Sequence, residues 1–180
     1  FKVLPTPESS KTLIIHEQKI ESALDFLDKS IGSSNDVSGA TFLPSDPKVS
    51  GCVMDIEKTF KLNDLKHKGS LTAIRIEGYK NSIEQRIQNL INELNVSEFK
   101  LSVLDTVQSE IFWNKIRSLE FFSNSNNSIL RIVIPPSECM QLLYQLSNKF
   151  KYFLDWGGAL IWLEAHNLSE EIFESIRKKV

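Results

Sequence analysis

One stretch near the C-terminal end decides the fold, and it reads Asp155-Trp156-Gly157-Gly158-Ala159-Leu160-Ile161-Trp162-Leu163. Two strand-like runs, 151–156 and 159–165, meet at the Gly-Gly pair, which is typical of a tight hairpin whose central residues need positive φ. A bare hairpin does not require a tryptophan on both sides of its turn, or an aspartate before it. The stretch therefore predicts two antiparallel strands and marks their turn as a candidate site.

The residues around the hairpin complete a β-α-β-β-α order. Residues 129–134 predict a strand, and Pro135-Pro136 opens a helix whose apolar residues recur at helical spacing. Ser169 is placed to cap a last helix. The second half of the chain, 128–180, is therefore nearly a repeat of the order found in the first half.

The first half, 11–105, predicts a β-α-β-β-α-β order, which is that of the ferredoxin-like motif. Asn81 is placed to cap the second helix, with Glu84 completing a capping box. Residues 45–69 are irregular and rich in lysine, and we interpret them as a solvated insertion that includes a short strand near 52–56; the alternative is a contact loop. The predicted strands are 11–16, 36–43, 71–77 and 98–104, and the predicted helices are 19–31 and 81–94.

A helix over 107–121, capped by Thr106, and a polar linker over 124–128 join the two halves. The fold class predicted is α+β: a seven-stranded antiparallel sheet flanked by helices and made of two ferredoxin-like halves. One face of the sheet collects apolar residues and can take the helices. The other is expected to face water, as in many antiparallel sheets, or a part that this chain lacks; it collects Arg75, Glu77, Lys100, Arg131, Lys151 and Asp155.

The composition is that of an ordinary soluble domain, with 41% hydrophobic and 24% charged residues in a chain of 180. A net charge of −2 argues against a nucleic-acid partner, since such binders are normally basic. Cys52 and Cys139 lie far apart and outside any metal-type spacing, so we interpret both as reduced thiols in a cytoplasmic protein. The first residues read as the end of a strand, which suggests a chain cut near a domain boundary.

No self-sufficient active site is evident in the sequence. The glycines are too scattered for a phosphate-binding loop, and Ser38 lacks the pattern of a nucleophile elbow. His16, His67 and His166 have no partners at ligand spacing, so no metal site is predicted. The catalytic residues remain unassigned.

Two groups of residues carry functional hypotheses. Trp113 and Arg117 are one helical turn apart, and an arginine over an indole can hold a planar or anionic group. The alternative is an arginine that extends over a tryptophan at the edge of the core. The second group is Arg131 and Asp155 beside the Gly-Gly turn, where the alternative is a hairpin with a salt bridge.

Six strings, in order along nearly the whole chain, resemble the C-terminal cap domain of FAD-linked oxidases of the vanillyl-alcohol oxidase superfamily. The chain is most similar to the FAD-binding E subunit of bacterial glycolate oxidase. The strings are Lys2-Val3-Leu4-Pro5-Thr6-Pro7-Glu8; Val37-Ser38-Gly39-Ala40 with Leu43-Pro44; Arg75-Ile76-Glu77-Gly78 with Ser82, Ile83 and Arg86; Phe112-Trp113 with Arg117; Leu130-Arg131 with Ile134-Pro135-Pro136-Ser137; and residues 155–163.

The resemblance implies that residues 1–6 end a missing flavin domain and that 7–180 form the cap, which covers the isoalloxazine. It implies FAD in the full-length protein and none bound by this chain alone. The implied activity is oxidation of glycolate or another small 2-hydroxy acid, with electrons passed on through an iron–sulfur subunit. The implied location is cytoplasmic, or peripheral to the inner membrane through partner subunits.

For the site, the resemblance and the two groups together predict that Asp155, Gly157, Gly158 and Arg131 contact the cofactor. Arg75, Trp113 and Arg117 are predicted to contact the substrate. The chain lacks the His-rich metal motif of the sister subunit, which leaves open whether it is catalytic or an electron relay. The alternative function is a stand-alone ferredoxin-like module that binds a small metabolite, or an assembly domain, without redox activity.

Overall fold

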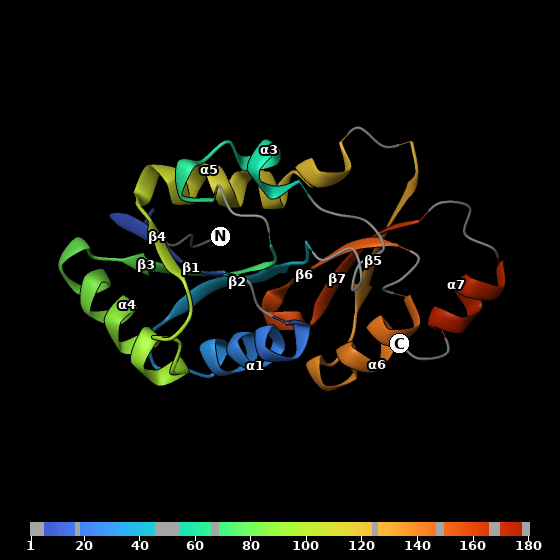
Figure 1. Ribbon diagram of the computed structural model, residues 1–180, viewed down its shortest axis with the longest axis horizontal. Helices are drawn as coiled ribbons and strands as arrows, with labels where there is room; N and C mark the ends of the chain where they lie inside the picture. The colour runs from blue at the N-terminus through green and yellow to red at the C-terminus, as the bar shows by residue number, and fades with distance from the viewer. Residues whose placement is uncertain are drawn as a thin grey trace, which may run out of the picture.

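The computed structural model describes residues 6–16, 19–45, 55–65, 69–123, 126–146, 150–165 and 170–177. A single seven-stranded sheet crosses the molecule, with helices packed on both of its faces (Figure 1).

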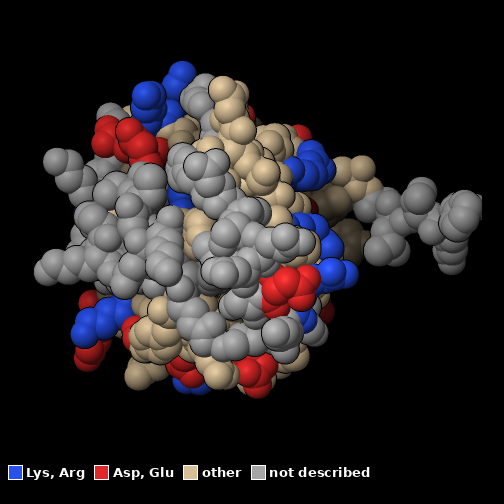
Figure 2. Space-filling model, turned by 90° about the vertical axis from the view of Figure 1, so that its right-hand side faces the viewer, with Lys and Arg blue, Asp and Glu red and all other residues tan. Residues whose placement is uncertain are grey.

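Within the described residues, no helix has the length and apolar character needed to cross a membrane. On the face seen in Figure 2, the described basic and acidic side chains are interspersed and form no large area of one sign.

Every pairing in the sheet is antiparallel, in the order β4-β1-β3-β2-β6-β7-β5. The prediction of an α+β fold with a seven-stranded antiparallel sheet is therefore confirmed. The strands are β1 (Ser9–His16), β2 (Val37–Leu43), β3 (Leu71–Gly78), β4 (Leu101–Leu104), β5 (Ser128–Val133), β6 (Lys151–Asp155) and β7 (Leu160–Ala165).

The helices cover the two faces unequally. In Figure 1, α1, α4 and α6 lie below the sheet, while α3 and α5 lie above it. The bounds are α1 (Ile20–Ile31), α3 (Ile56–Phe60), α4 (Lys80–Leu94), α5 (Thr106–Arg117), α6 (Pro136–Leu146) and α7 (Glu170–Arg177), with short 3₁₀ turns η1 (Asn63–Leu65), η2 (Glu120–Phe122) and η3 (Trp156–Gly158).

Alternation along the strands divides the core between the two faces. On β1, Leu13 and Ile15 pack with α4, while Ile14 between them packs on the opposite side with α5. The face predicted to be polar therefore has an apolar cluster of its own, in which Phe60 of α3 stacks on Phe112 of α5 with centroids 4.3 Å apart. The expectation that this face is wet, or covered by a part that the chain lacks, is wrong where Ile14, Leu71 and Phe153 lie, because α5 and α3 supply apolar residues to cover it.

The helices begin within one or two residues of the predicted positions, with different caps. The cap of α5 is Asp105, which forms a capping box with Gln108, and Thr106 instead bonds the hydroxyl of Ser9 at 2.9 Å. Helix α4 begins after Tyr79, which makes no side-chain cap bond, so the predicted Asn81 cap is wrong. The predicted helix 107–121 is interrupted by left-handed backbone at Leu119 (φ 56°) and continues as η2.

Some predicted features lie wholly or partly outside the described residues. Of the short strand expected near 52–56, residues 52–54 lie outside them, and Asp55 instead caps α3 by accepting a bond from the amide of Lys58. Ser169, His67, His166 and Cys52 also lie outside the described residues. The strand expected at 98–104 is shorter, because the amide of Phe99 donates to the carbonyl oxygen of Val96 at 3.0 Å and so belongs to a turn.

The hairpin between β6 and β7 has a four-residue turn, with Asp155 paired to Leu160 across it. Trp156, Gly157 and Gly158 all have positive φ, at 51°, 66° and 92°. The two glycines are buried against α1: a Cβ added to Gly157 would lie 2.7 Å from Ile31 Cγ1, and one added to Gly158 would lie 2.9 Å from a methyl group of Leu24. The Gly-Gly pair therefore lets the turn pack directly on α1.

Substitution of Gly157 by alanine tests this close approach. Left-handed backbone and overpacking against Ile31 should together lower the free energy of unfolding by about 2 to 4 kcal/mol, measured in urea. Gly32→Ala is the matched control, since Gly32 has ordinary helical backbone and an added Cβ would come no closer than 3.6 Å to Asp28 O. Equal effects of the two substitutions would contradict the packing role.

Candidate functional site

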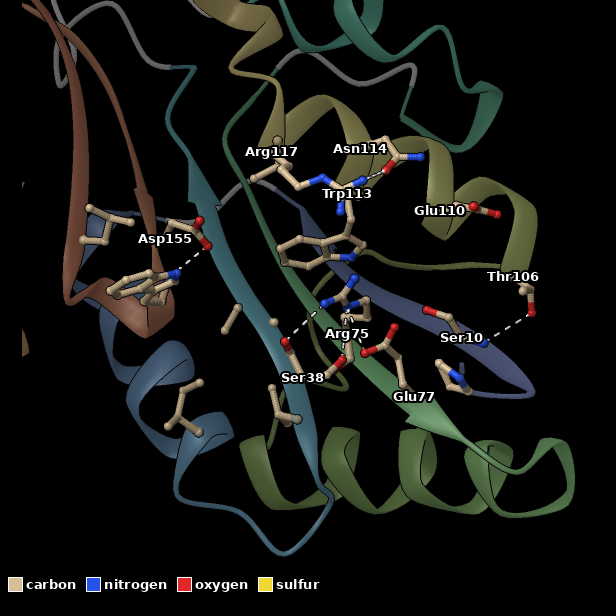
Figure 3. Close-up of a pocket in the computed structure, with 18 of the residues that line it drawn as sticks. Ser10, Ser38, Arg75, Glu77, Thr106, Glu110, Trp113, Asn114, Arg117 and Asp155 are labelled. Carbon is tan, nitrogen blue, oxygen red and sulfur yellow. Dashed lines mark hydrogen bonds and ion pairs between the residues drawn. The ribbon is translucent and has the colours of Figure 1, made fainter. Parts of the chain in front are cut away.

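A cleft of about 860 Å³ opens beside α5, between the middle strands and the β6–β7 turn. Arg75, Trp113, Arg117, Arg131 and Asp155 all line it, although they come from both halves of the chain. Figure 3 labels Arg75, Trp113, Arg117 and Asp155 within it. Gly157 and Gly158 are not among the lining residues, because they face α1. The two groups that the sequence singled out separately, together with Arg75, thus share one cleft.

Arg75 is held by contacts on several sides. Its guanidinium lies 4.9 Å from the centroid of the Trp113 ring, and its Nε donates to Ser38 Oγ at 3.0 Å. Nη2 donates to the carbonyl oxygen of Ser38 at 3.3 Å, and Glu77 Oε2 lies 3.6 Å from Nε. Figure 3 shows Trp113 reaching from α5 over this arginine of β3. Arg75 is therefore a fixed cation whose charge is partly compensated by Glu77.

The cation over Trp113 is thus Arg75, not Arg117 as the helical spacing suggested. Arg117 instead donates from Nη2 to Asn114 Oδ1 on the same helix. Gly39 lies opposite Arg75 on β2, and a Cβ there would come within 3.0 Å of the Trp113 ring. The absence of a side chain at Gly39 gives the indole its place over the sheet.

A chain of hydroxyl groups fixes the other side of the indole. Trp113 Nε1 donates to Thr12 Oγ1 at 2.9 Å, and Thr12 Oγ1 lies 2.6 Å from Ser109 Oγ. Ser109 Oγ in turn lies 3.0 Å from Ser10 Oγ, at the wall of the cleft. Thr12 and Ser109 are fully buried, so these bonds form out of water, where an unpaired indole N–H would be costly.

Sequence reasoning missed this hydroxyl chain. Its only local signal is a set of small polar residues on a strand and a helix that are otherwise apolar toward the core. Nothing in that signal says that the strand and helix face each other.

Arg131 forms the second arginine–tryptophan stack. Its guanidinium lies 4.8 Å from the centroid of the Trp156 ring, and Trp162 is its direct neighbour on β7. Within the described residues Arg131 has no ion pair, so the salt bridge to Asp155 that the hairpin alternative proposed is not present there. Its charge remains available to a ligand.

Asp155 ends β6 and accepts a hydrogen bond from the backbone amide of Trp156 at 2.9 Å. Burial raises the pKa of its carboxyl above the ordinary value, and this rise is opposed in part by the Trp156 amide and by the charge of Arg75. A cleft carboxyl that holds its proton more readily than usual is suited to proton transfer.

Other reactive groups lie elsewhere. Cys139 is a buried free thiol in the core beneath α6, and burial raises its pKa to about 12, so it stays protonated and unreactive at neutral pH. Among the described residues no group of three or more His, Cys, Asp or Glu side chains could hold a metal ion.

The raised pKa of Asp155 makes a prediction about stability. A carboxyl whose pKa is higher in the folded state stabilises the fold below its ordinary pKa of 3.8, and this contribution is lost as pH rises through the raised value. As the pH rises through this interval, the native chain loses this stabilisation and Asp155→Asn does not. The free energy of unfolding of Asp155→Asn should therefore increase relative to that of the native chain, measured by urea unfolding at a series of pH values. Asp155→Ala should show the same pH trend from a lower baseline, because it also loses the bond to the Trp156 amide. A difference that does not vary with pH would contradict the assigned shift.

Comparisons with known proteins place the fold. No protein-family model matches the chain, and no curated protein matches it in sequence. Among solved structures it is similar to 4-ethylphenol oxidase from Gulosibacter chungangensis in complex with isoeugenol, with a TM-score of 0.58 and 10% identity over 97% of this chain and 44% of that one. It is also similar to alkyldihydroxyacetonephosphate synthase, with a TM-score of 0.58 and 11% identity over 97% of this chain and 40% of that one. The chain therefore has the fold of a segment of these two enzymes and spans less than half the length of either.

Proposed function

We propose that the chain is the cap domain of an FAD-linked oxidoreductase of the vanillyl-alcohol oxidase superfamily, and that the whole protein oxidises a 2-hydroxy acid. The observation that carries this proposal is the convergence of Arg75, Trp113, Arg117, Arg131 and Asp155 on one cleft. These residues belong to the strings that resemble that superfamily, and they come together only in the folded chain. The fold shared with a phenol oxidase and a synthase supports the same family.

The cleft has the character that a flavin ring and a small acid require. Its volume of about 860 Å³ is within the usual range for ligand sites, and its walls carry planar indole and guanidinium groups. Arg75 and Arg131 would lie near the electron-rich edge of the flavin or the carboxylate of the substrate. When bound, FAD supplies the acceptor for the two electrons that the hydroxy acid loses.

The residues of this chain would bind and orient the acid. Arg131, which has no ion pair in the described structure, would hold the carboxylate of the substrate through paired N–H donors. Asp155 is the cleft carboxyl whose pKa is raised, and it would accept the proton of the substrate hydroxyl at its carboxylate. Trp113 and the hydroxyl chain behind it would keep Arg75 fixed during turnover.

The proposed assembly contains further parts. By resemblance to bacterial glycolate oxidase, they are an N-terminal flavin-binding domain and an iron–sulfur subunit that carries electrons onward. The short coverage of both structural relatives agrees with a larger protein. The cytoplasmic location remains a prediction from the sequence.

The test is to express the whole gene product, with any sequence that precedes this chain, and to measure its flavin. We expect a yellow protein with stoichiometric FAD, whose flavin absorption is bleached by a 2-hydroxy acid without oxygen. The 180-residue chain alone should be colourless, because most flavin contacts would come from the other domain. A whole gene product that binds no flavin would overturn the proposal.

A stand-alone metabolite-binding module is the second candidate. The observation that favours it is that one cleft already brings together two arginines, Arg75 and Arg131, and the carboxyl of Asp155. This candidate expects saturable binding of a small metabolite by a gene product that holds no flavin. Flavin content therefore separates the two candidates.

A further inference from the structure

The surroundings of Arg131 are strongly apolar. Trp162 faces it across β5 and β7, and Trp156 stacks on its guanidinium. Ile129 and Val133, two positions before and after it on the edge strand β5, are 40% and 42% exposed. Trp156 is 56% exposed, although its backbone has the positive φ of 51° that side chains rarely adopt. Arg131, which has no ion pair within the described part of the chain, is thus framed by large apolar groups that water reaches.

The tryptophans of the chain are concentrated at this place. The sequence contains three, and Trp113, Trp156 and Trp162 all line the cleft. Among the residues that the structure describes, no phenylalanine or tyrosine lines the cleft, although the chain has 11 phenylalanines. Trp113 is only 9% exposed, because Arg75 and Gly39 cover it, so the accessible indole surface belongs to Trp156 and Trp162. Both are next to Arg131.

Such a site matches a ligand with an anionic end and an apolar body. Glycolate has a carboxylate and a hydroxymethyl group, so it would occupy Arg131 and leave both indoles in water. An aromatic ring on the side chain of a larger 2-hydroxy acid would cover the indoles in offset or edge-on geometry. The apolar groups around Arg131 therefore favour an acid with an aromatic side chain over glycolate.

We infer that the substrate is a 2-hydroxy acid with an aromatic side chain, its carboxylate on Arg131 and its ring against Trp156 and Trp162. The inference rests on the proposed function and names the substrate of that site. Oxidation of phenyllactate to phenylpyruvate breaks the C2–H and O–H bonds and forms a C=O bond. FAD, when bound, would supply the acceptor for the hydride and its two electrons, and Asp155 would accept the hydroxyl proton.

The first experiment measures binding without turnover. All three indoles line the cleft, so the tryptophan fluorescence of the 180-residue chain reports on the cleft alone. Phenyllactate should change this fluorescence at concentrations about 10- to 100-fold lower than glycolate, from the burial of one aromatic ring. If the two acids change the tryptophan fluorescence at the same concentration, the inference is overturned.

The second experiment measures flavin reduction by the whole gene product. The second-order rate constant for flavin reduction should be about 10- to 100-fold higher for phenyllactate than for glycolate. Both enantiomers of phenyllactate are tested. Equal or reversed rates would overturn the aromatic substrate and leave the oxidoreductase in place. A gene product without flavin would overturn the proposed function instead, so the two failures are distinguishable.

A substitution ties the preference to the indole. Trp156→Asn removes the ring and keeps a residue that tolerates left-handed backbone, so the turn should remain intact. It should lower the ratio of phenyllactate to glycolate rates by about 5- to 10-fold, in line with the loss of one face of the aromatic contact. Tyr144→Ala, an exposed aromatic side chain on α6 outside the cleft, should leave the ratio unchanged. An unchanged ratio in Trp156→Asn would remove Trp156 from the site and overturn the inference.

Discussion

The cleft depends on the place where the two halves of the chain join into one sheet. There β2 pairs with β6 through Phe42 and Leu154, and Thr41 Oγ1 donates to the carbonyl oxygen of Leu154 at 2.5 Å. This buried contact joins residues more than a hundred positions apart. Arg75 belongs to one half and Arg131 to the other, so without this pairing they would line separate surfaces. The site is therefore a property of the joined sheet, and neither half contains it alone.

The two arginine–tryptophan stacks have the same chemistry and different electrostatics. Arg75 is bonded to Ser38, lies near Glu77 and is covered by a buried indole, so it forms part of the wall. Arg131 stacks on an exposed indole and has no ion pair in the described structure. A cation is worth most to a ligand where no carboxylate already neutralises it. This difference makes Arg131 the better candidate for direct ligand contact.

The β6–β7 turn shows how packing places a functional group. Gly157 and Gly158 pack against α1, and this approach carries Trp156 into left-handed backbone with its ring toward the cleft. Backbone of this kind in a non-glycine residue costs about 1 to 3 kcal/mol and is found where the surrounding structure enforces it. The glycines thus contribute to the site indirectly, because their packing on α1 positions Trp156. They do not line the cleft, so their position does not support the predicted contact with a cofactor.

Outside the insertion 45–69, where α3 was missed, periodicity in the sequence determined the order of strands and helices, because alternation and the 3.6-residue repeat are local properties of the chain. It also singled out Arg75, Trp113, Arg117, Arg131 and Asp155, which the folded chain brings to one cleft. Only the tertiary structure decided their partners. Helical spacing favoured Arg117 over Trp113, but Arg75 reaches the same ring from a strand distant in sequence. A glycine looks the same in the sequence whether its missing side chain makes room for a ligand or for a packed helix. Only the packing in the folded chain shows that Gly157 makes room for α1.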